Sequence, residues 1–218
     1  MSWTTLNDIA TIHGWYEPSK LAGLSDGDLI STQTDSSGLG RHVTAAGGSR
    51  PTYKTNIING LPVSRWSATG NIMSSASYSL SSVEMSCCAV VNLSALQDYN
   101  SIVNVDDASP PSGSPAVLGM YSGASLSAAG YTEQASSYRG YVTAGVAGQW
   151  RILTGIMQSS WIQWRANGRE LIESDRAGSL SAKTVTAYTH IGASSYGGSI
   201  RGDLAALVLW QETSLREH

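Results

Sequence analysis

Residues 160–172 read SWIQWRANGRELI, and this stretch decides the fold class more sharply than any other part of the chain. Two β-prone runs, 160–165 and 169–172, flank the dipeptide Asn167-Gly168. A type I′ turn needs positive φ at both central residues, and Asn and Gly adopt it at little cost. The stretch therefore predicts a tight β-hairpin. Asn59-Gly60 predicts a second hairpin earlier in the chain, between two further apolar runs.

Continuous apolar runs predict three more strands. They cover residues 85–93, 150–157 and 204–210. A run of this length without polar alternation is typical of a strand in the middle of a sheet, and we expect the first of them to be buried on both faces. The last predicts a core strand that completes the fold.

Other segments predict connections between the strands. Three prolines break the window 106–115, which predicts an exposed loop. The segment 6–16 is expected to begin with a short helix or turn, which Gly14 ends before Trp15 and Tyr16, and residues 213–217 hint at a terminal helical turn. Helical periodicity is otherwise almost absent. We therefore expect an all-β fold, a two-sheet antiparallel β-sandwich of the jelly-roll type. A sandwich of about 200–250 residues forms one unit, so residues 1–218 are interpreted as a single domain.

Composition excludes several classes of function. Only 13% of the 218 residues are charged and the formal net charge is -3, without a basic stripe that would bind nucleic acid. No run approaches the roughly 18 apolar residues of a membrane span, and no secretory signal follows Met1, so we expect synthesis in the cytoplasm. Cys87 and Cys88 are neighbours on a predicted strand and would point to opposite faces, which favours free thiols.

A set of motifs carries a resemblance to a known family. In chain order they are Trp15, DSSG at 35–38, RPTY at 50–53, NGLPV at 59–63, Trp150 with LTG at 153–155, Trp164 with Asn167-Gly168, Ile191-Gly192, RGDLA at 201–205, Trp210 and Leu215. Together they resemble laminin-G-like, concanavalin A-like jelly-roll domains over nearly the whole chain. The chain departs from that pattern at Ala206, where the family usually carries an acidic residue, and in its complete lack of Phe.

The resemblance also implies a function. Single domains of this type are similar to virion proteins of tailed bacteriophages. It therefore implies a non-enzymatic capsid decoration (cement) protein that binds neighbouring capsid or tail subunits, self-associates or stays particle-bound, and is located in the virion. One alternative is a carbohydrate-binding adhesin or receptor-binding module whose ligand is a host surface glycan. A weaker alternative is a polysaccharide hydrolase.

The acidic residues do not favour an enzyme. Glycoside hydrolysis requires two carboxyl groups across the scissile bond. The glucanases with the concanavalin A-like fold place these two carboxyl groups on one face of a strand. In this chain Glu170 has the opposite parity to Glu173 and Asp175. The four histidines are scattered and no G-x-S-x-G nucleophile motif follows a predicted strand. We therefore expect no enzymatic activity.

Aromatic residues in Ser/Gly-rich stretches are the candidate contacts for a glycan or a protein partner. Tyr138, Arg139 and Tyr141 form the most binding-like local cluster, and Tyr121 and Trp161 are further candidates. A tyrosine ring packed at a sheet edge with its hydroxyl in water is the competing interpretation.

The sequence requires no cofactor, but it leaves calcium open. Laminin-G domains often hold Ca²⁺ at the rim of the sandwich, and Asp26, Asp28 and Asp35 are candidates by residue type, with Asp106 as a fourth. A turn aspartate more often bonds its own backbone in an Asx turn, which is the interpretation we favour. The tripeptide Arg201-Gly202-Asp203 matches the start of a strand rather than an integrin-binding loop.

Overall fold

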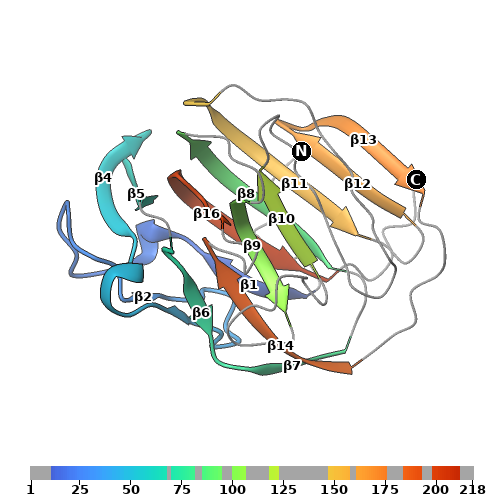
Figure 1. The fold of residues 1–218 in the computed structure, drawn as a ribbon, viewed down its shortest axis with the longest axis horizontal. Coiled ribbons are helices and arrows are strands. Elements are labelled where there is room, and N and C mark those ends of the chain that lie inside the picture. Colours follow the sequence, from blue (N-terminus) through green and yellow to red (C-terminus); the bar gives the residue numbers. More distant parts are fainter. Residues whose placement is uncertain are drawn as a thin grey trace.

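The computed structural model describes residues 11–67, 70–81, 85–94, 100–106, 118–122, 147–157, 161–175, 184–192 and 198–211. Two β-sheets form two layers with the hydrophobic core between them (Figure 1). The helical segments in these ranges are two single 3-10 turns, η2 (Pro18–Lys20) and η3 (Gly47–Ser49). No helix in these ranges is long and apolar enough to cross a membrane. The expected all-β sandwich is confirmed.

The first layer, sheet A, is an eight-stranded antiparallel sheet. Its order is β13 (Arg169–Asp175), β12 (Trp161–Ala166), β11 (Trp150–Met157), β8 (Ser86–Leu93), β16 (Gly202–Trp210), β5 (Leu61–Trp66) and β4 (Thr52–Ile58), with β1 (Ile12–Tyr16) also paired to β16. The expected strands 150–157 and 204–210 are confirmed as β11 and β16. The strand at 85–93 is confirmed as β8, but it is not buried on both faces, because Cys88 and Val90 alternate as half-buried residues with the buried Cys87 and Ala89.

The second layer, sheet B, is also eight-stranded. Its order is β10 (Leu118–Ser122), β9 (Asn100–Asp106), β14 (Thr184–Ile191), β6 (Met73–Ser75), β3 (Val43–Thr44) and β2 (Thr32–Gln33), with β15 (Gly198–Ser199) paired to β9 and β7 (Tyr78–Ser81) paired to β14. All of these pairings are antiparallel except that of the two-residue β15. Four of the eight strands are only two or three residues long, so β9 and β14 form the body of the layer.

Both predicted hairpins are present. Asn59 and Gly60 have φ of 49° and 77° between β4 and β5, and Asn167 and Gly168 have φ of 51° and 73° between β12 and β13. Positive φ at both central residues is the geometry for which these dipeptides are selected.

Large side chains other than Phe fill the core. Trp66 is 1% exposed and Tyr16 is 1% exposed, and both come from sheet A. The Trp66 ring lies so close to Gly192 at the end of β14 that a Cβ there would be 2.1 Å from the ring. Trp66 of sheet A therefore packs against sheet B across the core of a chain that contains no Phe. Gly192 is required because it has no side chain to collide with that ring.

Three expectations about local structure are corrected or left open. Residues 12–16 form strand β1, which pairs with β16 from Trp210 to Leu207. The start of the 6–16 segment, where a short helix or turn is expected, lies outside the described residues. Asp106 ends β9 with no exposed surface, and does not belong to an exposed loop. The remaining residues of that predicted loop and the predicted helical turn at 213–217 lie outside the described residues.

A buried histidine joins the two ends of the described chain. Arg41 donates a hydrogen bond to Nδ1 of His13 (2.7 Å), and the opposite nitrogen, Nε2, donates to Oε1 of Gln211 (3.0 Å). This arrangement needs the neutral imidazole, since Nδ1 must accept. Burial, and then the charge of Arg41, lower the pKa of His13 below its ordinary value of 6.5.

We expect this histidine to make the fold sensitive to acid. As the pH falls below 6.5, the unfolded chain takes up a proton at His13 that the folded chain excludes, so the free energy of unfolding falls. The His13→Gln variant carries no such charge and should lose less stability between about pH 7.5 and about pH 5. Urea unfolding at each pH measures both curves. Parallel curves for the two proteins would contradict the assignment.

Candidate functional site

The outer face of sheet B is identified from strand pairing. Thr189 faces the core, where its hydroxyl lies 2.8 Å from the buried hydroxyl of Tyr78. Side chains alternate along a strand, so Tyr188 and His190 point to the opposite, outer side. Residues directly paired with His190 share that side, which assigns Ser74 of β6 and Asn104 of β9 to the outer face.

A row of polar side chains crosses this face. It runs from Thr44 on β3 through Ser74 and His190 to Asn104, each residue paired with the next across the sheet. Strands lie about 4.8 Å apart, so the row is roughly 14 Å long. It begins at an exposed Thr44 and a half-buried Ser74, and it ends at His190 and Asn104, which are both 0% exposed. We refer to these four residues as the polar row.

Hydrogen bonding and stacking fix the middle of the polar row. The Ser74 hydroxyl lies 2.8 Å from Nδ1 of His190, which orients the imidazole. The Tyr188 ring stacks on the same imidazole, with centroids 6.1 Å apart and planes inclined by 18°. Tyr188 is half-buried and pairs with Asp106 of β9, which is 0% exposed. An aromatic ring, an imidazole and a carboxylate therefore lie together on this face.

Asn104 is the unusual member of the polar row. Its carboxamide is completely buried, and neither Oδ1 nor Nδ2 has a hydrogen-bond partner. A buried polar group left without a partner costs about 1–3 kcal/mol. A carboxamide offers two donors and an acceptor, so it matches a ligand group that both donates and accepts, such as a hydroxyl. Fold stability alone gives no reason to keep an asparagine there.

The Ser74–His190 contact does not have the geometry of the catalytic Ser–His pair of a hydrolase. Ser74 lies inside strand β6, whereas a serine nucleophile needs an exposed hydroxyl on a sharp turn after a strand. The contact also uses Nδ1 of the imidazole, the nitrogen that a catalytic triad reserves for its carboxylate.

The aromatic candidates from the sequence do not come together as one site in the described chain. Tyr121 lies on β10 of sheet B, paired with Ser101, and Trp161 lies on β12 of sheet A, paired with Asp175, so the two belong to different layers. Tyr138, Arg139 and Tyr141 lie outside the described residues. These five candidates therefore stay predictions.

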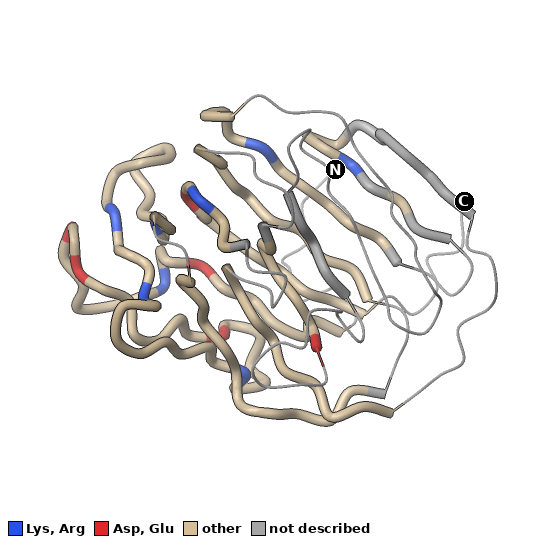
Figure 2. Tube along the Cα trace, viewed as in Figure 1, with Lys and Arg blue, Asp and Glu red and all other residues tan. Residues whose placement is uncertain are grey.

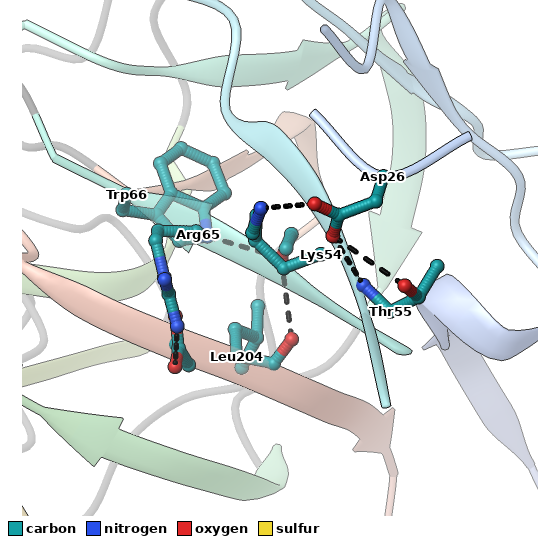
Figure 3. A network of polar contacts seen from close by, with 8 residues as sticks. Asp26, Lys54, Thr55, Arg65, Trp66 and Leu204 are labelled. Carbon is teal, nitrogen blue, oxygen red and sulfur yellow. Dashed lines mark hydrogen bonds and ion pairs between the residues drawn. The ribbon is translucent and has the colours of Figure 1, made fainter. Parts of the chain in front are cut away.

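Two of the calcium candidates are used to position a loop. Asp26 accepts hydrogen bonds from Nζ of Lys54 and from the backbone N–H of Thr55 (2.9 Å), so it ties the 26–28 turn to β4 (Figure 3). The bond from Lys54, and then that from Thr55, lower the pKa of Asp26. Asp28 accepts from the backbone N–H of Ser25 (2.7 Å). Neither makes the expected Asx turn to a following residue.

Asp35 does make the expected Asx turn. It accepts from the backbone N–H of Ser37 two residues on, at 2.9 Å, and also bonds groups outside the turn. Across the described ranges, no cluster of three or more His, Cys, Asp and Glu side chains is arranged to hold a metal ion.

The Arg201-Gly202-Asp203 tripeptide is structural, as expected from its match to a strand start. Gly202 and Asp203 begin β16, and Asp203 forms a two-point ion pair with Arg65 of β5, at 2.7 and 2.9 Å. The same two strands are joined by a chain of hydrogen bonds from the Trp66 indole through the Ser64 hydroxyl to the Leu204 carbonyl, drawn with Arg65 in Figure 3. These contacts join β5 to β16.

Sequence reasoning missed the polar row, although one signal was available. Residues 184–191 read TVTAYTHI, in which Val185, Ala187 and Ile191 share one parity and Tyr188 and His190 share the other. Such alternation marks a strand with one core face and one outer face. An aromatic and an imidazole side chain on the outer face of this strand indicated a candidate binding surface.

Comparisons with known proteins identify similar folds. No protein-family profile and no curated protein matches the sequence. Domain 4 of AbnA, an extracellular GH43 arabinanase from Geobacillus stearothermophilus solved with arabinotriose, has a TM-score of 0.61 and 13% identity over 86% of this chain and 94% of its own. A GH54 α-L-arabinofuranosidase matches at 0.61 and 13%, over 84% of this chain and 47% of its own. A sialidase from Trypanosoma rangeli matches at 0.61 and 11%, over 92% of this chain and 30% of its own.

These comparisons define the fold and nothing finer. The chain is a β-sandwich similar in structure to domains of glycoside hydrolases, and it spans less than half of the arabinofuranosidase and sialidase chains.

Proposed function

We propose that this domain binds carbohydrate, without catalysis, through the outer face of sheet B around the polar row. The buried carboxamide of Asn104, with no partner for either of its polar atoms, is the observation that carries the proposal. It lies beside His190, and the pair Tyr188–Asp106 is the next one on the same face of the sheet, so donors, acceptors and an aromatic ring converge on one area.

The chemistry of these groups suits a sugar. Each sugar hydroxyl both donates and accepts hydrogen bonds, and the carboxamide of Asn104 can accept through Oδ1 and donate through Nδ2. Hydrogen bonds are stronger where water is excluded, as it is at the buried end of the polar row. The half-buried Tyr188 offers an apolar ring beside a polar tip, which fits the mixed surface of a pyranose or furanose.

Two further considerations support binding rather than catalysis. The domain of the arabinanase with this fold was solved with arabinotriose, so a sandwich of this kind can accommodate an oligosaccharide. Asp106 is the one carboxylate on the strands of sheet B, and glycoside hydrolysis needs two. The decoration role on a phage particle, which the sequence resemblance favoured, stays a prediction, as do its capsid or tail partners and its place in the virion.

The test separates a binding role of Asn104 from a structural one. We expect the full-length protein to bind at least one neutral oligosaccharide from an arabinan, xylan, glucan and galactan series, measured by isothermal titration calorimetry. Asn104→Val should weaken that binding by about tenfold or more, because one hydrogen-bonded carboxamide is lost. The same variant should change the free energy of unfolding by less than about 1 kcal/mol, since no hydrogen bond of the fold is removed.

Asn71 provides a matched control. It is also a buried asparagine, but its Nδ2 donates to the carbonyls of Gly48 (3.2 Å) and Arg50 (3.0 Å). Asn71→Val should therefore lower the free energy of unfolding by about 2 kcal/mol. Binding of no oligosaccharide in the series, or unchanged affinity in Asn104→Val, would overturn the proposal.

A further inference from the structure

Sheet B is almost free of formal charge. Its eight strands contain a single residue among Lys, Arg, Asp and Glu, which is Asp106 at the end of β9. Figure 2 shows β6 and β14 without acidic or basic residues and one acidic position at the end of β9. Among the described side chains, the outer face also carries hydroxyls, the Asn104 carboxamide and the His190 imidazole.

The described cations lie elsewhere and have other roles. They lie in loops, in the turn η2 or on sheet A: Lys20, Arg41, Arg50, Lys54, Arg65, Arg151, Arg165, Arg169 and Arg201. Arg41, in the loop between β2 and β3, is held by His13 and stacks on the Tyr78 ring at 3.9 Å, and Tyr78 bonds the core-facing Thr189. Its charge is therefore directed to the core side of the sheet and away from the polar row.

From this distribution we infer that the site takes a neutral, hydroxyl-bearing glycan and discriminates against acidic sugars such as sialic acid, uronic acids and phosphorylated sugars. The inference rests on the proposed function and specifies its ligand class. Recognition of a carboxylate or phosphate usually relies on Arg or Lys, often in two-point contacts. On the described strands of sheet B an acidic sugar would meet none of these, and it would also lie near the carboxylate of Asp106.

The polar row fits the inferred ligand in form as well as in charge. It presents hydroxyls at its exposed end, from Thr44 and Ser74, and the carboxamide of Asn104 at its buried end. A short neutral oligosaccharide would first meet the hydroxyls of Thr44 and Ser74, and it would reach Asn104 only by displacing the part of the chain that buries that carboxamide. Water is excluded at the buried end, where an unpaired negative charge on the ligand would be least tolerated.

Matched ligand pairs test the inference on the wild-type protein. Each neutral oligosaccharide that binds is compared with its own acidic derivative, for example a galactoside with its sialylated form and an oligogalacturonate methyl ester with the free acid. We expect the neutral member to bind about tenfold or more tightly at low ionic strength. In Asp106→Asn, which removes the one carboxylate, the difference between the members of a pair should shrink.

The outcomes separate the inference from the proposed function. If neutral members bind and their acidic partners bind as tightly or more tightly, the ligand class is wrong and the carbohydrate site stands. If neither member of any pair binds, the proposed function fails and the inference fails with it. Circular dichroism of Asp106→Asn is recorded first, and if that variant does not fold, the wild-type pairs alone decide.

Discussion

Replacing Gly202 with alanine lowers the free energy of unfolding by about 4 kcal/mol, the largest expected effect of a single substitution in this domain. Gly202 has φ of 141°, and a Cβ at this position would lie 2.1 Å from the carbonyl oxygen of Asn92 and 2.8 Å from Cα of Leu93. Both are backbone atoms of β8, so no rotamer change relieves the collision. Either β16 moves away from β8 or the start of β16 loses its pairing with β8 and β5.

A second glycine separates this collision from backbone strain. Gly60 in the β4–β5 hairpin has φ of 77°, but a Cβ there would meet nothing within 4 Å. Gly60→Ala should therefore cost only about 1 kcal/mol, the strain of a non-glycine residue at positive φ. Urea unfolding followed by tryptophan fluorescence measures both variants. Equal losses of stability in the two variants would show that the close contact between β16 and β8 is not the reason why position 202 requires glycine.

The hairpin at Gly60 belongs to the part of the fold that the sequence predicted. The hairpins at Asn59-Gly60 and Asn167-Gly168 depend on two adjacent residues, so local sequence suffices to predict them. The strands β11 and β16 follow from short apolar runs. Strand β1 was missed because its partner, β16, lies at the other end of the chain, and local preferences of residues 12–16 carry no information about that pairing.

The candidate site was less predictable for a related reason. Thr44, Ser74, Asn104 and His190 are ordinary surface residue types, and each lies on a different strand. Only the register of three separate strand pairs brings them into one row. The sequence pattern pointed instead to tyrosines in Ser/Gly-rich stretches, because binding residues often lie in loops. Here the group with unmet hydrogen bonds, the Asn104 carboxamide, lies on the sheet itself, and its burial cannot be inferred without the fold.

Removing the carboxylate of Asp35 is the other substitution with a large expected effect. Asp35 is 5% exposed, and its Oδ1 accepts from the backbone N–H of Trp15 (3.0 Å) and of Ser37 (2.9 Å). Its Oδ2 accepts from the Ser37 hydroxyl (2.8 Å) and from the backbone N–H of Arg41 (2.9 Å). One side chain thus holds β1, its own turn and the segment leading to β3.

We expect Asp35→Ala to lower the free energy of unfolding by about 3–4 kcal/mol. Three backbone N–H groups lose their acceptor, each at a cost of about 1–3 kcal/mol that water entering the loop partly offsets. Asp35→Asn should cost about half as much, because it keeps one acceptor but points an amide donor at the N–H of Arg41. Asp28→Ala is the control, since it removes one exposed hydrogen bond and should cost less than about 1 kcal/mol.

The order of these three variants also tests what the motif at 35–38 is for. If Asp35 organises the loop through backbone donors, thermal and urea unfolding should rank Asp28→Ala as mildest, then Asp35→Asn, then Asp35→Ala. The ranking would explain why an aspartate accompanies Trp15 and Arg41, since both supply backbone donors to it. If Asp35→Ala is as stable as Asp28→Ala, the carboxylate does not support the loop, and its buried position needs a ligand to account for it.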